Sequence, residues 1–411
     1  MRVLFISNLY PPHEAGGWEQ NCQEIASRLQ ARGHVCHVLT SRHGVHGRSP
    51  LEANVTRALH LEAGIYHYRP LDFFIRRPWQ ERANRRALHE TLYLFKPDIV
   101  FIWGMWNLSR RVAYWAEQWL PGRVAYAVAS YWLVEGDPHE AYWQRPARRP
   151  WVGMLLAPAR SLALRTLARE HKAHPLALEQ VACVSEYVRS KLDEARALPH
   201  GARVIYNGID PQPFLGASAG HPARHHELRL IYTGGILSHK GVHTAIEALG
   251  LLKQRGDGDA LHLALVGGGH PDYEAQLRHR VAELGLEACV TFYGRVPRDQ
   301  IPILLGESDV FLFTSVWEEP IARTVMEAMA ARLAVIGTPV GGQQEMLQDG
   351  ANALLFPSGD PEGLANCIQR LQRDPHLRGR LAEAGRQTVL ARFTLPRMVD
   401  DMEAWLSEIV S

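Results

Sequence analysis

The sequence lacks any apolar run of about 18 residues, so it predicts no helix that crosses a bilayer. Its first apolar stretch, Val3–Ile6, is only as long as a strand, so no secretory signal peptide is expected. Cysteine is scarce. The five cysteines in 411 residues form no Cys-x-x-Cys pair, which argues against a disulfide framework or a zinc knuckle. These absences together predict an intracellular, cytoplasmic protein.

Known cofactor signatures are also missing. No Gly-x-Gly-x-x-Gly or Walker loop follows either of the strands expected to open the two halves, which argues against a dehydrogenase and against a bound dinucleotide or ATP. No His/Cys cluster has the ligand spacing of a zinc site. The sequence therefore predicts no cofactor and no metal.

Charge is unevenly distributed along the chain. Residues 1–200 carry 26 Lys and Arg against 18 Asp and Glu, whereas residues 201–411 carry 19 against 25. A basic first half suits nucleic acid, an anionic membrane or a phosphorylated substrate. The acidic second half argues against a protein that coats nucleic acid, so no nucleic-acid partner is expected.

Both halves alternate short β-branched runs with stretches of helical spacing, which predicts an α/β fold of two doubly wound, parallel-sheet domains. The expected strands of the first half are Val3–Ser7, Val35–Thr40, Ile99–Trp103, Val124–Ala129, Gln180–Val184 and Val204–Tyr206. Those of the second half are Leu230–Tyr232, Leu263–Val266, Val290–Phe292, Val310–Phe313, Ala334–Ile336 and Ala353–Phe356.

The domain boundary is expected near Asn207–Pro213, before a linker rich in Gly, Pro and His at 216–226. Residues 1–207 then form one domain and 208–390 the other. A final helix at about 391–411 has no strand after it and is free to pack elsewhere. Since parallel sheets bind ligands at the carboxyl ends of their strands, two such domains facing each other predict one cleft.

Three segments follow expected strands and could carry chemistry. Gly16-Gly17 precedes a helix and could bring backbone amides to a phosphate, or could only form a tight turn. Gly234-Gly235 leads to Lys240, which could neutralise a leaving diphosphate or could simply be solvated. The third segment contains Glu319 and Glu327.

Pro320 suits a first helical turn, which predicts Glu319 on the loop before a helix and Glu327 about two turns inside it. Carboxylates accept paired hydrogen bonds from vicinal hydroxyls, so Glu327 suits a ribose and Glu319 a hexose. The alternative is that Glu318 and Glu319 complement the helix dipole while Glu327 is a surface acid.

Several motifs in order along the chain resemble family-four retaining glycosyltransferases of the GT-B fold (glycosyl transferases group 1). They are Gly16-Gly17, Asn207-Gly208-Ile209-Asp210, Lys240-Gly241, Gly267-Gly268-Gly269, Phe292-Tyr293-Gly294, Glu319 with Glu327, and Gly341-Gly342 with Glu345. The resemblance spans nearly the whole chain.

The resemblance implies a second domain that binds a UDP-, GDP- or ADP-sugar and a first domain that binds the acceptor, with the final helix crossing back onto the first domain. It implies that Glu327 grips the ribose, Glu319 contacts the sugar and Lys240 binds the diphosphate. It further implies donor contacts by backbone amides of Ala322, Arg323 and Thr324, and recognition of the base by Phe292, Tyr293 and Gly294. Front-face transfer with retention of configuration follows by the same analogy.

Two positions depart from the family's pattern. The family commonly has a diphosphate-binding arginine five residues before the lysine, where this chain has Gly235; Arg295 or Arg323 could substitute. It also tends to have a histidine near the reacting sugar, where this chain has Ala129 and Ser130. His139 lies nearby and is expected to be a surface residue.

Aromatic residues crowd the loops after first-domain strands, and flat rings can stack on sugars. Trp18, Trp106, Tyr131 and Trp132 are therefore candidates for binding a glycan or lipid-linked acceptor, although helix packing would equally explain such rings. The stretch Tyr142–Leu156, with Arg160, Arg165, Arg169 and Lys172 beyond it, mixes Trp and Leu with arginines. It suits peripheral contact with an anionic membrane or a solvated basic face.

Other functions stay open at this stage. Gly235 and the absent histidine make a non-catalytic nucleotide-sugar-binding protein or partner subunit conceivable. A third reading is a relative of the same fold that epimerises or phosphorolyses sugars, although no pyridoxal-phosphate site is evident.

Overall fold

The computed structural model describes residues 1–13, 16–45, 52–65, 68–146, 149–216, 227–258 and 260–411. The chain divides into two compact units. The N-terminal unit comprises Met1–Val184, Val188–Ile205 and Val399–Ser411, and the C-terminal unit comprises Ser185–Tyr187 and Tyr206–Met398. The expected division between residues 207 and 208 compares with an observed main division between 205 and 206. Part of the expected linker, 217–226, lies outside the described residues.

The N-terminal unit is built on a seven-stranded parallel sheet of order β3-β2-β1-β4-β5-β6-β7. Its strands are β1 (Arg2–Ser7), β2 (Val35–Ser41), β3 (Val55–Leu59), β4 (Ile99–Gly104), β5 (Val124–Val128), β6 (Gln180–Cys183) and β7 (Arg203–Val204). Its helices are α1 (Gly17–Ala31), α2 (Pro70–Ile75), α3 (Arg77–Phe95), α4 (Arg110–Trp119), α5 (Pro138–Gln144) and α6 (Pro150–Ala173), with α7 (Glu186–Glu194) at the unit boundary.

The C-terminal unit has a six-stranded parallel sheet of order β10-β9-β8-β11-β12-β13. Its strands are β8 (Leu228–Thr233), β9 (Leu261–Val266), β10 (Val290–Gly294), β11 (Val310–Phe313), β12 (Ala334–Gly337) and β13 (Leu354–Leu355). Its helices are α8 (Gln212–Leu215), α9 (Val242–Gln254), α10 (Pro271–Glu283), α11 (Ile301–Gly306), α12 (Arg323–Ala330), α13 (Pro361–Arg373) and α14 (Pro375–Arg392). Three short 3₁₀ helices, η1 (Ser238–Lys240), η2 (Arg298–Gln300) and η3 (Gly341–Glu345), lie in its loops.

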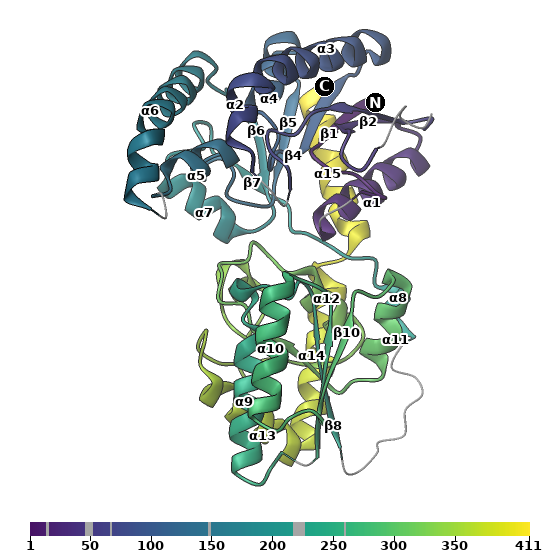
Figure 1. Ribbon diagram of the computed structural model, residues 1–411. Coiled ribbons are helices and arrows are strands. Elements are labelled where there is room, and N and C mark those ends of the chain that lie inside the picture. The colour runs from purple at the N-terminus through teal and green to yellow at the C-terminus, as the bar shows by residue number, and fades with distance from the viewer. Residues whose placement is uncertain (14–15, 46–51, 66–67, 147–148, 217–226, 259) are drawn as a thin grey trace. The chain divides into compact units, whose positions relative to one another are not determined.

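Helices cover both faces of each sheet (Figure 1). This arrangement explains why central strands such as β1 and β4 are almost entirely buried and read as continuous apolar runs. All twelve expected strands are present, with ends that shift by a few residues. Strand β3 is not predicted by the sequence pattern, because this edge strand carries the polar residues Thr56 and Arg57 and lacks a continuous apolar run.

The last helix, α15 (Leu395–Val410), belongs to the N-terminal unit from Val399 onward. Trp405 is buried there, with its ring centroid 6.0 Å from that of Phe101. On the outer side, Arg32 of α1 pairs with Asp400 at 2.6 Å. No helix among the described residues is long and apolar enough to pass through a membrane.

Candidate functional site

In the C-terminal unit, two glycine-rich turns lie against each other where β8 and β9 end. The Gly234 amide donates to Val266 O at 2.9 Å, and the Ile236 amide donates to Gly268 O at 3.1 Å. A Cβ on Gly267 would lie 1.8 Å from Gly234 O, so the second turn needs glycine for close backbone packing. Gly235 accepts a hydrogen bond at its carbonyl from the Tyr232 hydroxyl, at 2.8 Å.

A cationic side chain, that of Arg295, lies near the turn in which this chain has Gly235 instead of an arginine. A Cβ on Gly268 would lie 3.1 Å from Nε of Arg295, so the Arg295 side chain crosses this turn, next to the turn that holds Gly235. Arg323, the other candidate substitute, is the first residue of α12.

The Lys240 turn is fastened to the end of β11. Gly241 has a φ of +68°, and a Cβ there would lie 2.0 Å from Thr314 O. Thr314 Oγ1 donates to Lys240 O at 2.9 Å, and the Val316 amide donates to His239 O at 3.0 Å. These bonds place the lysine beside the loop that carries Glu319.

Lys240 and Glu319, the two predicted catalytic residues, form an ion pair between Nζ and Oε1. Ser315 Oγ donates to the same carboxylate oxygen at 3.1 Å. The Glu319 side chain is 9% exposed and that of Lys240 is 25% exposed. Trp317 shields the ammonium group, which lies 5.4 Å from its ring centroid. The pair is therefore a partly desolvated charge pair at the ends of β8 and β11.

The backbones of Gly341 and Gly342 pack against the loop that carries Glu319. The Gly342 amide donates to Glu319 O at 2.8 Å, and a Cβ on Gly342 would lie 1.8 Å from Pro320 O. Gly341 has a φ of +59°. Glu345, at the end of η3, accepts from the amides of Glu186 and Tyr187 at 3.0 and 2.8 Å. Glu345 thus binds the first two amides of α7.

The expectation that Pro320 opens a helix is wrong. Helix α12 begins at Arg323, after the extended residue Ala322, because the close approach of Gly342 keeps Pro320 in the loop. Glu319 does lie on the loop before the helix, as expected. Ala322 has no capping side chain, so the first amides of α12, those of Arg323 and Thr324 among them, receive no bond from it.

Glu327 is the fifth residue of α12, just over one turn inside the helix. Its side chain is only 5% exposed, so it is no surface acid, and Oε1 accepts from Arg298 Nη2 at 3.1 Å. Arg298 follows β10, the strand that ends in Tyr293 and Gly294. Tyr293 is exposed, whereas the Gly294 carbonyl accepts from the Gly267 amide at 2.8 Å.

In the N-terminal unit, Gly16 is the residue before α1, and its amide donates to Glu19 Oε2 at 3.0 Å. Glu14 and Ala15 of the same segment lie outside the described residues. Trp18 stacks on Trp103 with ring centroids 4.2 Å apart, and its Nε1 donates to Trp103 O at 2.7 Å. These contacts give Trp18 a packing role.

A cavity of about 390 Å³ opens in this unit beyond the carboxyl ends of β3, β4 and β5. Two of the four predicted acceptor-binding aromatics, Trp106 and Trp132, line it together with Tyr68, Tyr142 and Arg110. Tyr131 is buried and is not part of the lining. The Arg110 guanidinium lies 5.7 Å from the centre of the Trp132 ring, and burial lowers the pKa of Arg110.

The prediction that His139 lies at the surface is wrong, because this residue is buried. Its Nδ1 lies 2.7 Å from the Tyr68 hydroxyl, and its ring meets Phe73 edge-on at 5.0 Å. Burial and the nearby Arg77 charge lower the pKa of His139 to about 3, so its ring is neutral at physiological pH.

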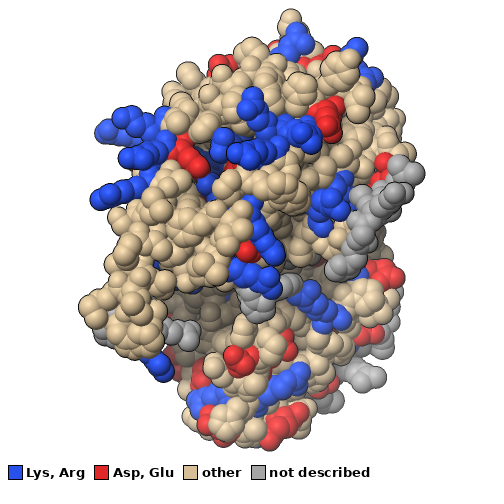
Figure 2. Space-filling view, turned by 45° about the horizontal axis from the view of Figure 1, so that its top comes forward, with Lys and Arg blue, Asp and Glu red and all other residues tan. Residues whose placement is uncertain are grey.

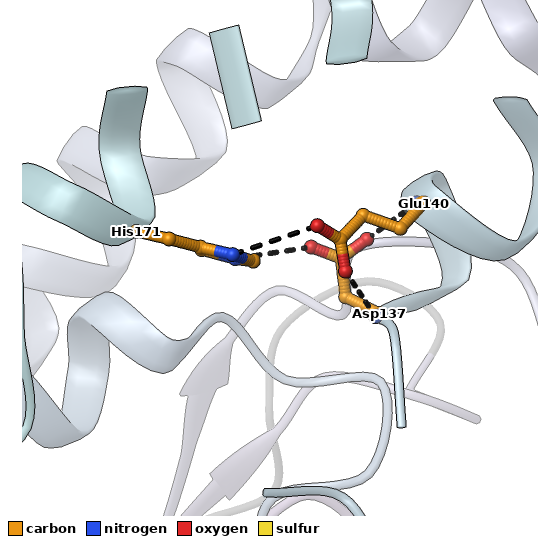
Figure 3. Close-up of side chains that lie close together, drawn as sticks. All are labelled: Asp137, Glu140 and His171. Carbon is orange, nitrogen blue, oxygen red and sulfur yellow. Dashed lines mark hydrogen bonds and ion pairs between the residues drawn. The ribbon is translucent and has the colours of Figure 1, made fainter. Parts of the chain in front are cut away.

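The structure also assembles a cluster that the sequence spacing did not reveal. Asp137 and Glu140, at the start of α5, converge on the ring of His171 from α6 (Figure 3). Asp137 Oδ2 lies 3.8 Å from Nε2, and Glu140 Oε1 lies 3.5 Å from Nδ1. The ligand atoms lie within 4.8 Å of one another, near enough to hold a metal ion. Asp137 also caps α5 by accepting from the Glu140 amide at 2.8 Å, which gives the cluster a structural role.

Near this cluster, the Arg77 guanidinium lies within ion-pair distance of three carboxylates. Arg77 lies 2.7 Å from Glu170, 3.6 Å from Glu62 and 3.9 Å from Glu81. Burial, reinforced by the Asp137 charge, raises the pKa of Glu62 to about 8. Glu62 also lines the cavity that contains Trp106 and Trp132, so the ion pairs of Arg77 lie next to that cavity.

The family described as Glycosyl transferases group 1 matches residues 217–388, and Glycosyltransferase Family 4 matches residues 15–213. The amylovoran biosynthesis glycosyltransferase AmsK of Erwinia amylovora is 34% identical over 171 residues, which are 40% of this chain and 40% of AmsK. The lipopolysaccharide core biosynthesis glycosyltransferase LpsE of Rhizobium meliloti is 33% identical over 168 residues, 41% of this chain and 46% of LpsE. The matches therefore span less than half of each of these relatives.

Two solved structures share the fold over nearly the whole chain. Sucrose-phosphate synthase from Thermosynechococcus elongatus superposes with a TM-score of 0.75 at 21% identity and covers 99% of this chain and 98% of its own. Anabaena Alr3699/HepE, solved with UDP and glucose, superposes with a TM-score of 0.70 at 19% identity, covering 99% and 100%.

We predict that Gly342→Ala destabilises the C-terminal unit by about 1–3 kcal/mol, because the added Cβ would overlap Pro320 O and force the backbone apart. Gly216→Ala is the control, since its Cβ would enter open space and should leave stability almost unchanged. Urea unfolding of both variants measures the difference. Equal midpoints would show that the close approach is not required.

We predict a pH effect at Glu62. Because its pKa rises from 4.5 to about 8 on folding, the folded state favours the protonated form. The stability from this group is complete below pH 4.5 and is lost as the pH rises toward 8. Glu62→Gln removes the titration, so the variant should lose less stability than the wild type between pH 5 and 8.5. Parallel pH profiles in urea unfolding would refute the assignment.

Proposed function

Because this chain belongs to the family-four, group 1 glycosyltransferases and has the GT-B fold, we propose that it moves a sugar from a nucleoside-diphosphate sugar to an acceptor hydroxyl, with retention of anomeric configuration. The observation that carries the proposal is the charge pair Lys240–Glu319 on the loops after β8 and β11. In the same unit lies the buried carboxylate of Glu327. The proposal covers the activity of the whole chain, its substrates and its partners.

The donor would be bound by the C-terminal unit. Lys240 would contact the diphosphate, helped by the amides of Ala322, Arg323 and Thr324 at the positive end of α12. We assign the second cation to Arg295, which crosses the turn next to Gly234 and Gly235. UDP is a reasonable first choice, since Alr3699/HepE was solved with UDP and with UDP-glucose.

The remaining donor contacts would recognise the sugars and the base. Glu327 would accept from the ribose hydroxyls, with Arg298 holding one of its oxygens in place. Glu319 would accept from hydroxyls of the transferred sugar, and the backbone of Tyr293 and Gly294 would meet the base.

Catalysis would rest on position and charge. The bond between the anomeric carbon and the diphosphate oxygen breaks, the acceptor oxygen bonds to that carbon on the same face, and the acceptor proton passes to the departing diphosphate. Lys240 is already held in place by Glu319, so it can stabilise the charge that develops on the leaving oxygen with little reorganisation. Gly16 and Gly17 at the start of α1 stay candidate donor contacts, and the Gly16 amide would exchange Glu19 Oε2 for the donor. We propose that this transfer needs no metal.

The acceptor would be bound by the N-terminal unit in its cavity of about 390 Å³. Trp106 and Trp132 offer ring faces for a sugar, and Arg110 offers donors to hydroxyl or anionic groups. AmsK and LpsE are named for amylovoran and lipopolysaccharide core biosynthesis, which supports a glycan or lipid-linked glycan acceptor in polysaccharide synthesis.

We predict that Lys240→Ala lowers kcat about 10²–10³-fold, the usual loss for a contact that stabilises transition-state charge. Lys253→Ala on α9 is the matched control, because the Lys253 ammonium donates to Gly285 O and takes no part in the Lys240–Glu319 pair, so this variant should keep full activity. Product formation from UDP-, GDP- and ADP-sugars measures both. Nucleotide-sugar binding without any product from the wild type would instead favour a non-catalytic binding protein.

We predict that Glu327→Ala removes selectivity for the ribose hydroxyls. The wild type should bind the preferred nucleoside diphosphate at least about tenfold more tightly than its 2′,3′-dideoxy analogue, because a buried carboxylate would lose its hydrogen bonds. The variant should bind both about equally. Glu287→Ala, an exposed acid in the same unit, should keep the wild-type ratio in calorimetry. A preserved ratio in Glu327→Ala would place the ribose elsewhere.

A further inference from the structure

Helix α6 has apolar side chains on two faces. One face is buried, where Ala163 and Leu167 pack with Phe73 of α2 and Trp143 of α5. Another face carries Trp151, Met154, Leu155, Pro158 and Leu162, at spacings of three, four, seven and eleven residues from the first. These spacings bring the five side chains onto one stripe of a helix.

The stripe is exposed. Met154 and Leu155 are each 72% exposed, Leu162 is 57% and Trp151 is 55%. None of the residues from Trp151 to Pro158 is buried, whereas Ala163 and Leu167, further along α6, are buried. Figure 1 shows α6 at the edge of the N-terminal unit, beside α5. Single exposed apolar residues are common, whereas a continuous apolar stripe indicates an interaction surface.

Arginines lie at both ends of the stripe along the chain, and this part of the sequence carries no acidic residue. The sequence contains no Asp or Glu from Ala141 to Arg169. Arg149 precedes the helix, Arg160 is exposed on it, and Arg165 and Arg169 continue the apolar stripe by one and two further turns. In Figure 2, Lys and Arg side chains gather over the upper part of the view, with Asp and Glu scattered among them.

We propose that this α6 surface, made of Trp151, Met154, Leu155, Leu162, Arg165 and Arg169, docks the protein on an anionic phospholipid bilayer. The apolar side chains enter the interfacial region, and the guanidinium groups meet lipid phosphates. A second copy of this chain fits less well, because a twofold interface would place this basic surface against itself. The inference concerns a surface outside the donor site, so it stands or falls separately from the proposed transfer.

The test uses the full chain and vesicles of phosphatidylcholine with or without phosphatidylglycerol, in a co-sedimentation assay. We expect binding only when phosphatidylglycerol is present, and weaker binding as salt rises. Met154→Glu with Leu155→Glu should lower the partition coefficient at least tenfold. Neutralising Arg165 and Arg169 to Gln should lower it about fivefold for each cation, which corresponds to about 1 kcal/mol each.

Two matched controls separate docking from general effects. Leu94→Glu changes an apolar residue on α3 that is 78% exposed, and Arg123→Gln changes an exposed arginine in the same unit. Both should bind vesicles as the wild type does, and all variants should keep the wild-type unfolding midpoint. The proposal is overturned if the α6 variants bind like the wild type, or if binding ignores phosphatidylglycerol and salt. An α6-dependent dimer in analytical ultracentrifugation without vesicle binding would also overturn it.

Discussion

The C-terminal unit is organised around one partly buried charge pair. A carboxylate as enclosed as that of Glu319 is costly to keep ionised unless a cation and hydrogen-bond donors compensate for the lost water. Lys240 and Ser315 supply both, and each comes from a different loop. The surrounding loops are bonded so that these groups meet. Glycines 241 and 342 let backbones approach where any side chain would separate them.

This arrangement favours chemistry that depends on fixed charge. A lysine that is already oriented by a carboxylate and an aromatic ring loses little freedom when an anion arrives. Glu327 is also held by a cation. Arg298 donates to one oxygen of its buried carboxylate and so fixes the orientation of that group. In the proposed function, Lys240 and Glu327 would therefore bind a diphosphate and a ribose with little reorganisation of their side chains.

The N-terminal unit uses charge differently. Arg77 is shared by Glu62, Glu81 and Glu170, and Arg111 lies 3.8 Å from Glu81. Burial, reinforced by the Asp137 charge, raises the pKa of Glu62 to about 8. This network lies under a cavity with aromatic walls, whereas α6 turns an apolar stripe and arginines outward. The N-terminal unit thus has a cavity lined by aromatic and charged residues and an exposed amphipathic helix, and both are formed by loops or helices outside the parallel sheet.

The sequence by itself determined the alternation of strands and helices and the two-unit division, and it predicted Lys240, Glu319 and Glu327 as site residues. Buried parallel strands leave continuous apolar runs, and glycine-flanked polar residues after such runs mark sheet edges. Only the tertiary structure decided the edge strand β3, the late start of α12, the packing of Trp18 on Trp103 and the cluster of Asp137 with His171. Each of these depends on partners between 22 and 85 residues away, or on an edge position, which local periodicity does not record.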